Sequence, residues 1–461
     1  MGTRREPGGS RWAGDGKGLE GHGGLACAHV LNPLSGCLIF RIPRRGRASS
    51  EPGPACTREK RVPSMEFSKN IARLQPSATI AVSSLAKQLK AEGRDIINLS
   101  AGEPDFDTPE WISDAGVQGI REGKTRYTPA PGTPDLRKAI AADLQRQFGG
   151  EVDWNAVVVN AGAKHSLFNT CFSLFGPGDE ILIASPYWTS YPQMVGLAQA
   201  EPVFVFGPQE KDFRVTPEDL EKKATDRTRG LIICSPSNPS GAVYTLDELK
   251  AVAEWARDRG VWVIADEIYR YINFTSDGRA PSFMDLPKAS VGDFVLVDGV
   301  SKAFAMTGWR IGFTYSDVEL AKKMAALQSH TTSNPAAPSQ EAALAAYTQT
   351  ERAEGEIKRM VEAFGRRRDL AVRLFDELLP GFSYVKPNGA FYLCFRVDSS
   401  FREGMDDSSA VCKWLLEAAE IAVVPGVAFG DDRYVRMSYA TSDELLEEGI
   451  RRLAKAVEGL E

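Results

Sequence analysis

The stretch GLIICSPSNPSGAVYTLDELKAVAEWARDRGVWVIADEIY (230–269) contains the pattern that decides the fold. It opens on the apolar run 230–234 and closes on a second apolar run, 261–265. Both runs are rich in Val and Ile and do not alternate with polar residues, which is typical of strands buried on both faces. Polar residues follow each run directly.

The segment between these two runs is predicted to be a helix over 245–259. Thr245 and Glu248 have the spacing of a capping box, and Gly260 can end the helix in a left-handed conformation. The spacing of four apolar residues predicts one buried face, made of Leu246, Leu249, Ala253 and Ala256. The stretch therefore predicts a strand–helix–strand unit.

Apolar runs of the same kind recur elsewhere, at 156–159, 180–184, 203–206 and 294–297, with a further helix expected at 164–175. The alternation of strands and helices predicts an α/β fold with a largely parallel sheet. Beyond about residue 345 the pattern changes to a helix, a strand, a helix and a last helix capped at Thr441 or Ser442. The ranges expected for the first three are 351–379, 390–397 and 408–420. This predicts a second, α+β domain.

Composition narrows the class of protein. The 461 residues suggest about two to four domains. With 43% hydrophobic and 25% charged residues the chain can bury a large core, and no apolar run reaches the roughly 18 residues that span a bilayer. The net charge of −6 argues against a nucleic-acid partner. The seven cysteines form no C-x-x-C pair, which favours reduced thiols and a cytoplasmic location.

Residues 1–64 differ from the rest of the chain. They carry nine Arg and two Lys against five acidic residues, a net charge of +6, and lack a helical or strand period. Three interpretations are open: a transit peptide to an organelle, a disordered leader, or upstream sequence included by a misplaced start before Met65. The acidic residues fit a transit peptide poorly, and we favour the misplaced start.

Polar residues whose side chains could bind a ligand or take part in catalysis follow the predicted strands. Because ligands bind at the carboxyl edge of open α/β sheets, these side chains are expected to meet there. They are Lys164, Trp188, Asn238, Asp266, Tyr269 and Lys302, with Arg310 eight residues after the lysine.

Several other kinds of site are excluded by their missing motifs. Gly123-Lys124-Thr125 resembles the end of a P-loop, but Gln118 stands where the upstream glycine is required. The sequence has no H-E-x-x-H, no G-x-S-x-G and no G-x-G-x-x-G after a strand. His165 and His330 are isolated from any metal-ligand spacing, so no metal site is expected.

The residues at this edge suit pyridoxal 5′-phosphate (PLP), which a lysine amine anchors covalently. The turn 161–164, with Gly162, Ala163 and Lys164, could bind the phosphate together with Ser301 and Arg310. A buried Asp266 suits the pyridine nitrogen, and Asn238 and Tyr269 suit the phenolate oxygen. Trp188 offers an aromatic face to the ring.

The segment SKAFAMTGWRIG (301–312) resembles the PLP-lysine signature of the class I aminotransferases of fold type I. Asn238-Pro239 and Asp266-x-x-Tyr269 precede it at the expected distances, and the similarity extends over residues 65–461. The nearest subgroup is the bacterial-type aspartate aminotransferases, some of which also use prephenate. Its marks are PSAT (76–79), AGEPDF (101–106), YTPAPG (127–132) and PYW (186–188).

The resemblance implies a role for each matching residue. Lys302 would hold PLP and then move the substrate proton, with Asp266 and Tyr269 as the other catalytic residues. Arg436 would bind the substrate α-carboxylate, helped by Asn238, Trp188 and the Gly102 backbone. Tyr127 would reach the phosphate of a neighbouring subunit, which implies a homodimer, and a distal carboxylate would meet Ser77, Thr79 and Lys164. One position departs from many relatives, which have Ser or Thr where this chain has Gly299.

The resemblance also implies the domain boundaries and the reaction. The large PLP domain, with a seven-stranded sheet, is expected over 111–345, and the small domain over 346–461 completed by 65–110. The expected reaction is ping-pong transamination between aspartate or glutamate and a 2-oxo acid, with prephenate as a further acceptor. The alternatives are aromatic, alanine or kynurenine aminotransferases, and an amino-acid-sensing regulator built on the same fold. No nucleic acid or membrane is expected as a partner.

Overall fold

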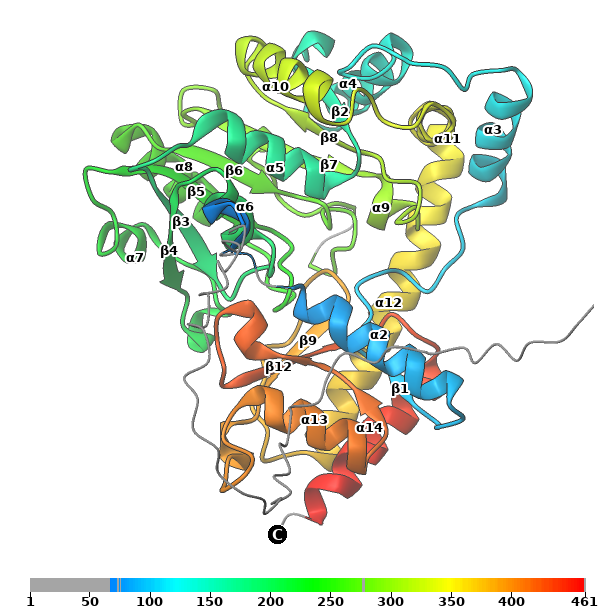
Figure 1. The fold of residues 1–461 in the computed structure, drawn as a ribbon, viewed down its shortest axis with the longest axis vertical. Coiled ribbons are helices and arrows are strands. Elements are labelled where there is room, and N and C mark those ends of the chain that lie inside the picture. Colours follow the sequence, from blue (N-terminus) through cyan, green and yellow to red (C-terminus); the bar gives the residue numbers. More distant parts are fainter. Residues whose placement is uncertain (1–66, 73, 75, 276–277, 460–461) are drawn as a thin grey trace, which may run out of the picture. The chain divides into compact units, whose positions relative to one another are not determined.

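A seven-stranded sheet organises the larger part of the fold in this computed structural model (Figure 1). The structure describes residues 67–72, 74, 76–275 and 278–459, so the interpretations of residues 1–64 lie outside it. The strand order is β2-β8-β7-β6-β5-β3-β4, and β8 is antiparallel to both of its neighbours while the other pairs are parallel. The strands are β2 (Val157–Asn160), β3 (Glu180–Ser185), β4 (Glu201–Phe206), β5 (Thr228–Cys234), β6 (Trp262–Asp266), β7 (Phe294–Gly299) and β8 (Gly312–Tyr315).

The α/β class and the largely parallel sheet are confirmed. Each of the six apolar runs forms a strand of this sheet. The seventh strand, β8, was not marked by its own apolar pattern because its residues GFTY are few and include a polar Thr. Its position between β2 and β7 arises from pairing across the fold.

Helices cover both faces of this sheet, as the packing of β5 shows. Leu231 and Ile233 pack in one core cluster, and Ile232, which points to the opposite face, packs in another. The helices and short 3-10 turns of this part are α3 (Glu110–Arg121), α4 (Pro134–Phe148), η1 (Trp154–Ala156), α5 (Ala163–Leu174), α6 (Tyr191–Leu197), η2 (Gln209–Lys211), α7 (Pro217–Glu221), α8 (Leu246–Arg259), η3 (Phe283–Asp285), α9 (Val300–Ala303), α10 (Val318–Thr331) and α11 (Ala337–Thr348).

Helix α8 begins and ends where the sequence predicts. Thr245 and Glu248 form the capping box, and Gly260 ends the helix with φ 66°. The predicted buried face is wrong at one position, because Leu246 is 42% exposed while Val252 is buried. Leu246 is the first residue of α8, at the end of the helix.

A second, smaller group of elements lies in the lower half of Figure 1, where β9 and β12 are flanked by α13 and α14. Its three-stranded sheet has the order β11-β12-β9, and β1 pairs in parallel with β10. The elements are α2 (Ala78–Ala91), β1 (Ile97–Asn98), α12 (Thr350–Leu378), β9 (Tyr392–Arg396), η4 (Asp398–Ser400), α13 (Ser408–Ala418), β10 (Ile421–Ala422), β11 (Val424–Pro425), η5 (Gly426–Phe429), β12 (Tyr434–Ser438) and α14 (Asp443–Glu458). The short helix α1 (Lys69–Ala72) lies against α6 of the larger part.

The elements predicted beyond residue 345 are confirmed as α12, β9, α13 and α14. Of the two caps considered for the last helix, Ser442 is the one used, since its side chain accepts a hydrogen bond from the Leu445 N–H. None of the helices among the described residues has both the length and the apolar composition needed to cross a membrane.

Candidate functional site

A cavity of about 400 Å³, here called the sheet-edge cavity, opens at the carboxyl ends of the parallel strands. Asp266 ends β6, and Lys302 lies in α9 directly after β7. The structure brings most of the sequence-predicted residues to this one cavity. Those lining it are Ser77, Thr79, Gly102, Ala163, Lys164, Trp188, Asn238, Asp266, Tyr269, Ser301, Lys302, Arg310 and Arg436.

Lys302 and Asp266 are the two groups in the cavity whose ionisation is most shifted toward neutral pH. Burial lowers the pKa of Lys302 to about 8, and its Nζ donates to the Gly102 carbonyl at 2.6 Å. Burial raises the pKa of Asp266 to about 6, although a hydrogen bond from Tyr191 opposes that rise. The Tyr191 hydroxyl donates to Asp266 Oδ2 at 2.6 Å. Such shifts, in a cavity, are typical of proton-transfer sites.

Arg436 forms a buried cationic wall of the cavity. It is 2% exposed, and its Nη1 donates to Asn238 Oδ1 at 3.0 Å while Nη2 donates to the Ser100 carbonyl at 2.7 Å. Its Nε has no hydrogen-bond partner among the described residues. Burial lowers the pKa of Arg436. A buried guanidinium with donors to spare can bind a carboxylate through two parallel hydrogen bonds.

Two tyrosines of the cavity, Tyr269 and Tyr392, contact each other, and Tyr392 also contacts Arg436. The hydroxyls of Tyr269 and Tyr392 are 2.8 Å apart, and the ring of Tyr392 lies 4.3 Å from the Arg436 guanidinium carbon. Burial raises the pKa of Tyr269 well above its usual value, so its hydroxyl stays protonated and can donate a hydrogen bond.

A cationic corner lies where α5 begins. Gly162 precedes the helix with φ 87°, and a Cβ there would lie 2.3 Å from Arg310 Nη2. The glycine therefore lets the guanidinium approach the first turn of α5, the end of a helix at which N–H groups are available to an anion. Arg310 itself is held by the Thr307 carbonyl at 2.9 Å. Ser301, also predicted to bind phosphate, is buried and lines the same cavity.

The three residues expected to meet a distal carboxylate line the cavity from two helices, α2 and α5. Ser77 and Thr79 are at the start of α2, with their hydroxyls 2.9 Å apart, and Ser77 makes no side-chain cap hydrogen bond. Lys164, from the first turn of α5, lies over the Trp188 ring with its Nζ 4.9 Å from the ring centre. An ordinary helix cap therefore does not account for the Ser77 hydroxyl.

Of the predicted residues, Gly162 and Tyr127 do not line the cavity, and Tyr127 is 91% exposed. Gly299, the position that departs from many relatives, has a steric reason. A Cβ there would lie 2.7 Å from the Gly312 Cα and 2.8 Å from the Ile311 carbonyl. The end of β7 and the start of β8 approach too closely for a side chain.

Sequence reasoning missed Tyr191 and Tyr392. Tyr191 follows the quoted PYW segment by three residues, and Tyr392 stands in the predicted strand 390–397. The position of Tyr191 close behind the PYW segment was a weak signal. Nothing local marked Tyr392, because its hydroxyl contacts Tyr269, which is 123 positions away in the sequence.

The residues at the sheet-edge cavity match the chemical groups of PLP. Asp266 is a buried carboxylate, Lys302 is an amine with a lowered pKa, and the corner at Gly162 and Arg310 is a cationic cradle that a Cβ would fill. Within the described ranges no group of three or more His, Cys, Asp or Glu residues has the arrangement of a metal site.

Comparison with known proteins shows that the chain is similar to the members of one family. A family profile described as "Aminotransferase class I and II" matches residues 94–453. The chain is 41% identical over 397 residues to an aspartate aminotransferase of Geobacillus stearothermophilus, covering 86% of this chain and 99% of that protein. It is also 41% identical over 392 residues to a probable aspartate/prephenate aminotransferase of Aquifex aeolicus, covering 85% and 98%.

Solved structures agree with the sequence comparison. The fold is similar to that of the Thermus thermophilus aspartate aminotransferase solved with maleate, with a TM-score of 0.80 and 38% identity. The similarity covers 85% of this chain and 100% of that one.

Proposed function

This chain belongs to the class I and II aminotransferases, and from that premise we propose that it transfers an amino group between L-aspartate or L-glutamate and a 2-oxo acid, with PLP as its cofactor. The observation that carries the proposal is the shared cavity lined by Lys302, Asp266 and Arg436. It combines an amine that can hold a carbonyl cofactor, a buried carboxylate and a buried guanidinium for a substrate carboxylate.

PLP, when bound, supplies a conjugated ring that accepts the electrons left at the substrate Cα when its proton is removed. Lys302 Nζ would anchor it, and the first turn of α5 with Arg310 and Ser301 would hold its phosphate. Asn238 and Tyr269 would donate hydrogen bonds to its phenolate oxygen, and Trp188 would cover its ring. The cavity's volume of about 400 Å³ lies within the range of small-molecule sites.

Asp266 would hold a proton on the cofactor's ring nitrogen through a charge-assisted hydrogen bond. Its carboxylate is buried, and the hydrogen bond from Tyr191 favours its charged form. Lys302, once displaced by the amino substrate, would take the proton from Cα. Its pKa of about 8 suits this role, because a general base works best when its pKa is near the working pH.

Two contacts would select the substrate. Arg436 would bind the α-carboxylate, because Asn238 and the Ser100 carbonyl already fix its guanidinium. Lys164 with Ser77 and Thr79 would bind a second, distal carboxylate, which favours aspartate and glutamate over uncharged amino acids. Prephenate, also a 2-oxo acid with a second carboxylate, fits the same pair of contacts, and we include it as a further acceptor.

The test is the absorption spectrum of the purified full-length chain with PLP, before and after adding L-aspartate. A near-visible band that aspartate removes, and that Lys302→Ala lacks, is the expected result. Lys322→Ala is the control, since Lys322 is an exposed lysine on α10. A band that neither aspartate nor glutamate changes would refute the substrate assignment, and the absence of any band with added PLP would refute the cofactor.

We also infer that the enzyme is a homodimer in which Tyr127 completes the partner's phosphate site. The support is the 91% exposure of this large aromatic side chain. Co-expression of Lys302→Ala with Tyr127→Ala chains tests the inference. Each variant alone should be nearly inactive, whereas the mixture should recover about a quarter of wild-type activity, because hybrid dimers contain one intact site. No recovery in isolated hybrid dimers would contradict it.

A cytoplasmic location is part of the proposal. Its support is the free state of Cys171, Cys234, Cys394 and Cys412, which is usual in a reducing compartment. Cell fractionation of the full-length chain tests it, and recovery with an organelle or membrane fraction would contradict it.

A further inference from the structure

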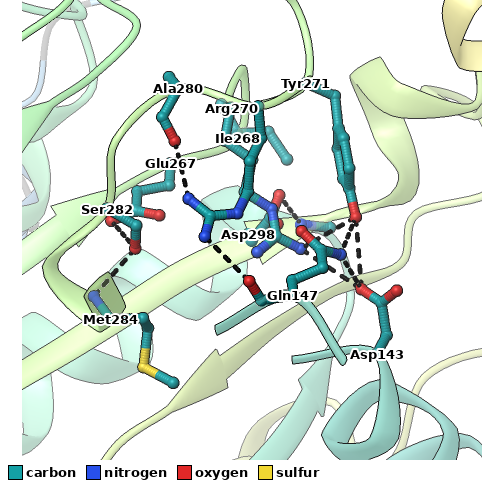
Figure 2. Close-up of polar contacts among 12 residues, drawn as sticks. Asp143, Gln147, Glu267, Ile268, Arg270, Tyr271, Ala280, Ser282, Met284 and Asp298 are labelled. Carbon is teal, nitrogen blue, oxygen red and sulfur yellow. Dashed lines mark hydrogen bonds and ion pairs between the residues drawn. The ribbon is translucent and has the colours of Figure 1, made fainter. Parts of the chain in front are cut away.

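A buried group of charged residues lies where β6 and β7 end, together with one residue of α4 (Figure 2). We call Arg270, Asp298, Asp143 and Glu267 the β6–β7 charge cluster. Each of the four is less than 9% exposed, and Arg270 is completely buried. None of them lines the cavity, so the proposed chemistry leaves the cluster unexplained.

The shortest ion pair of the cluster joins Arg270 to Asp298. Arg270 Nε lies 2.8 Å from Asp298 Oδ2, and the other Asp298 oxygen accepts the Gly299 N–H at 2.7 Å. Asp143 lies farther away, with its Oδ2 3.6 Å from Arg270 Nη2. The guanidinium also lies over the ring of Tyr271, 4.8 Å from its centre.

The other groups facing this pair are mostly acidic. Glu267 Oε1 accepts hydrogen bonds from the Ser282 hydroxyl at 2.8 Å and from the Phe283 N–H at 3.2 Å. Gln147 and Tyr271 contact Asp143, as Figure 2 shows. Arg146 binds Asp143 at 2.7 Å from the solvent side. Within the part of the chain that the structure describes, Arg270 is the fully buried cation beside these carboxyl groups, and removing it would leave Asp298 without its ion-pair partner.

The two residues of the pair belong to the two segments that carry the proposed catalytic groups. Arg270 directly follows Tyr269 in the turn after β6, a turn closed by the Arg270 N–H and the Glu267 carbonyl at 2.8 Å. Asp298 precedes Lys302 by four residues at the end of β7.

Neither segment has much stability of its own. Lys302 lies in α9, which has only four residues, and so short a helix is not stable without tertiary contacts. The backbone pairing of β6 with β7 ends at Asp266 and Val297. The chain reaches Tyr269 and Lys302 only beyond these two residues. Beyond the last paired residues, the Arg270–Asp298 ion pair is a direct side-chain connection between the two segments.

We propose that Arg270 and Asp298 are positioning residues that set the distance of Lys302 from Asp266 and Tyr269. The proposal rests on the function proposed above. Removing one partner of a buried ion pair destabilises a protein strongly, so the effect of each variant on stability is measured separately from its effect on the site.

The experiment compares Arg270→Met, Asp298→Asn and Arg270→Lys with the control Arg279→Met. Arg279 forms a similar pair with Asp285 at 2.6 Å, but its segment contributes no residue to the cavity. Three quantities are measured on each PLP-loaded variant: kcat, KM for L-aspartate, and the pH midpoint of the bound-PLP absorbance without substrate. Urea unfolding of the apoprotein measures stability.

We expect Arg270→Met and Asp298→Asn to lower kcat about 10-fold or more while KM changes less than about threefold, since Arg436 is untouched. The absorbance midpoint should shift by about half a pH unit or more, because the electrostatic interaction between the Lys302 nitrogen and Asp266 depends on the distance between them. Arg270→Lys, which keeps a cation near Asp298, should recover part of both changes, and Arg279→Met should change neither.

Wild-type kcat and midpoint in folded Arg270→Met and Asp298→Asn would overturn the proposal, even if both variants are less stable. Equal shifts in Arg279→Met would overturn it as well. If Arg270→Met does not fold, Arg270→Lys and Asp298→Asn carry the test. The pH midpoint of the absorbance can be measured on any protein that binds PLP, with or without transaminase activity. A wild-type protein that binds PLP but lacks this activity would refute the proposed function. The effect of Arg270 and Asp298 on the midpoint could still be measured in that case.

Discussion

The pKa of the Asp266 carboxyl depends more on Tyr191 than on any other neighbouring residue. Tyr191 is 2% exposed and donates to Asp266 Oδ2 at 2.6 Å. Tyr191→Phe keeps the packing but removes this donor, so the pKa of Asp266 should rise and its hold on the cofactor's ring nitrogen should weaken. We expect PLP to bind about 10-fold more weakly, measured by equilibrium dialysis.

Tyr244→Phe is the matched control for that change. Tyr244 is an equally buried tyrosine that accepts a hydrogen bond from the Val215 N–H, and it does not line the cavity. Equal PLP affinities for the two variants would show that the Tyr191 hydroxyl has no special role.

Lys164 is the residue whose charge should distinguish substrates. Lys164→Met removes the cation but keeps a long apolar side chain over Trp188. We expect kcat/KM for aspartate to fall about 10-fold or more, while the value for alanine, which has no distal carboxylate, changes little. Steady-state assays with both amino acids measure this ratio, and an equal loss for both would mean that Lys164 acts on the cofactor alone.

At the scale of elements, the approach of β7 to β8 limits what position 299 can hold. Gly299→Ser would place a Cβ 2.7 Å from the Gly312 Cα. We expect the two strands to separate, lowering the free energy of unfolding by about 1–3 kcal/mol and displacing α9. Urea unfolding measures the first effect, and the absorbance of bound PLP reports the second.

Gly355→Ala supplies the contrasting control. Gly355 is exposed within α12, and a Cβ there would meet nothing within 4 Å. The substitution should stabilise the protein by up to about 1 kcal/mol, because alanine favours helix interiors. If Gly299→Ser is tolerated as well as Gly355→Ala, the close approach does not explain the glycine at 299.

At the scale of the whole molecule, three buried carboxyl groups should make stability depend on pH. Burial raises the pKa of Asp266 to about 6, of Asp298 to about 7 and of Glu267 to about 8. Each folded-state value exceeds the unfolded one, so the folded protein binds more protons between the two values. The free energy of unfolding of the apoprotein should therefore fall as pH rises from about 5 to 8.

Glu267→Gln isolates one contribution to this dependence. It removes a titrating group, so the decline between pH 5 and 8 should become shallower, by about 1.4 kcal/mol per pH unit where Glu267 is protonated in the folded protein and ionised in the unfolded one. Urea unfolding of the apoprotein at several pH values measures both slopes. Identical slopes for wild type and variant would show that folding does not raise the pKa of Glu267, which would then be ionised in both the folded and the unfolded protein over this range.

Much of the fold and the site could be predicted from local pattern. The six apolar runs predicted their strands, because residues buried on both faces must be apolar throughout. The ends of α8 followed from the chemistry of Thr245, Glu248 and Gly260. The residues after each strand could be named because parallel strands bring their carboxyl ends to one edge. The assigned roles and the domain boundaries remain predictions.

The sequence by itself determined the α/β class, the family and the group of residues that meet at the sheet edge, since these depend on periodicity, capping and short motifs. Only the tertiary structure decided the insertion of β8, the contact of Arg436 with Asn238, the tyrosines beside Asp266 and Tyr269, and the Arg270–Asp298 pair. These contacts join residues up to about 200 positions apart. Their partners depend on which surfaces meet when the chain closes, and no local pattern records that.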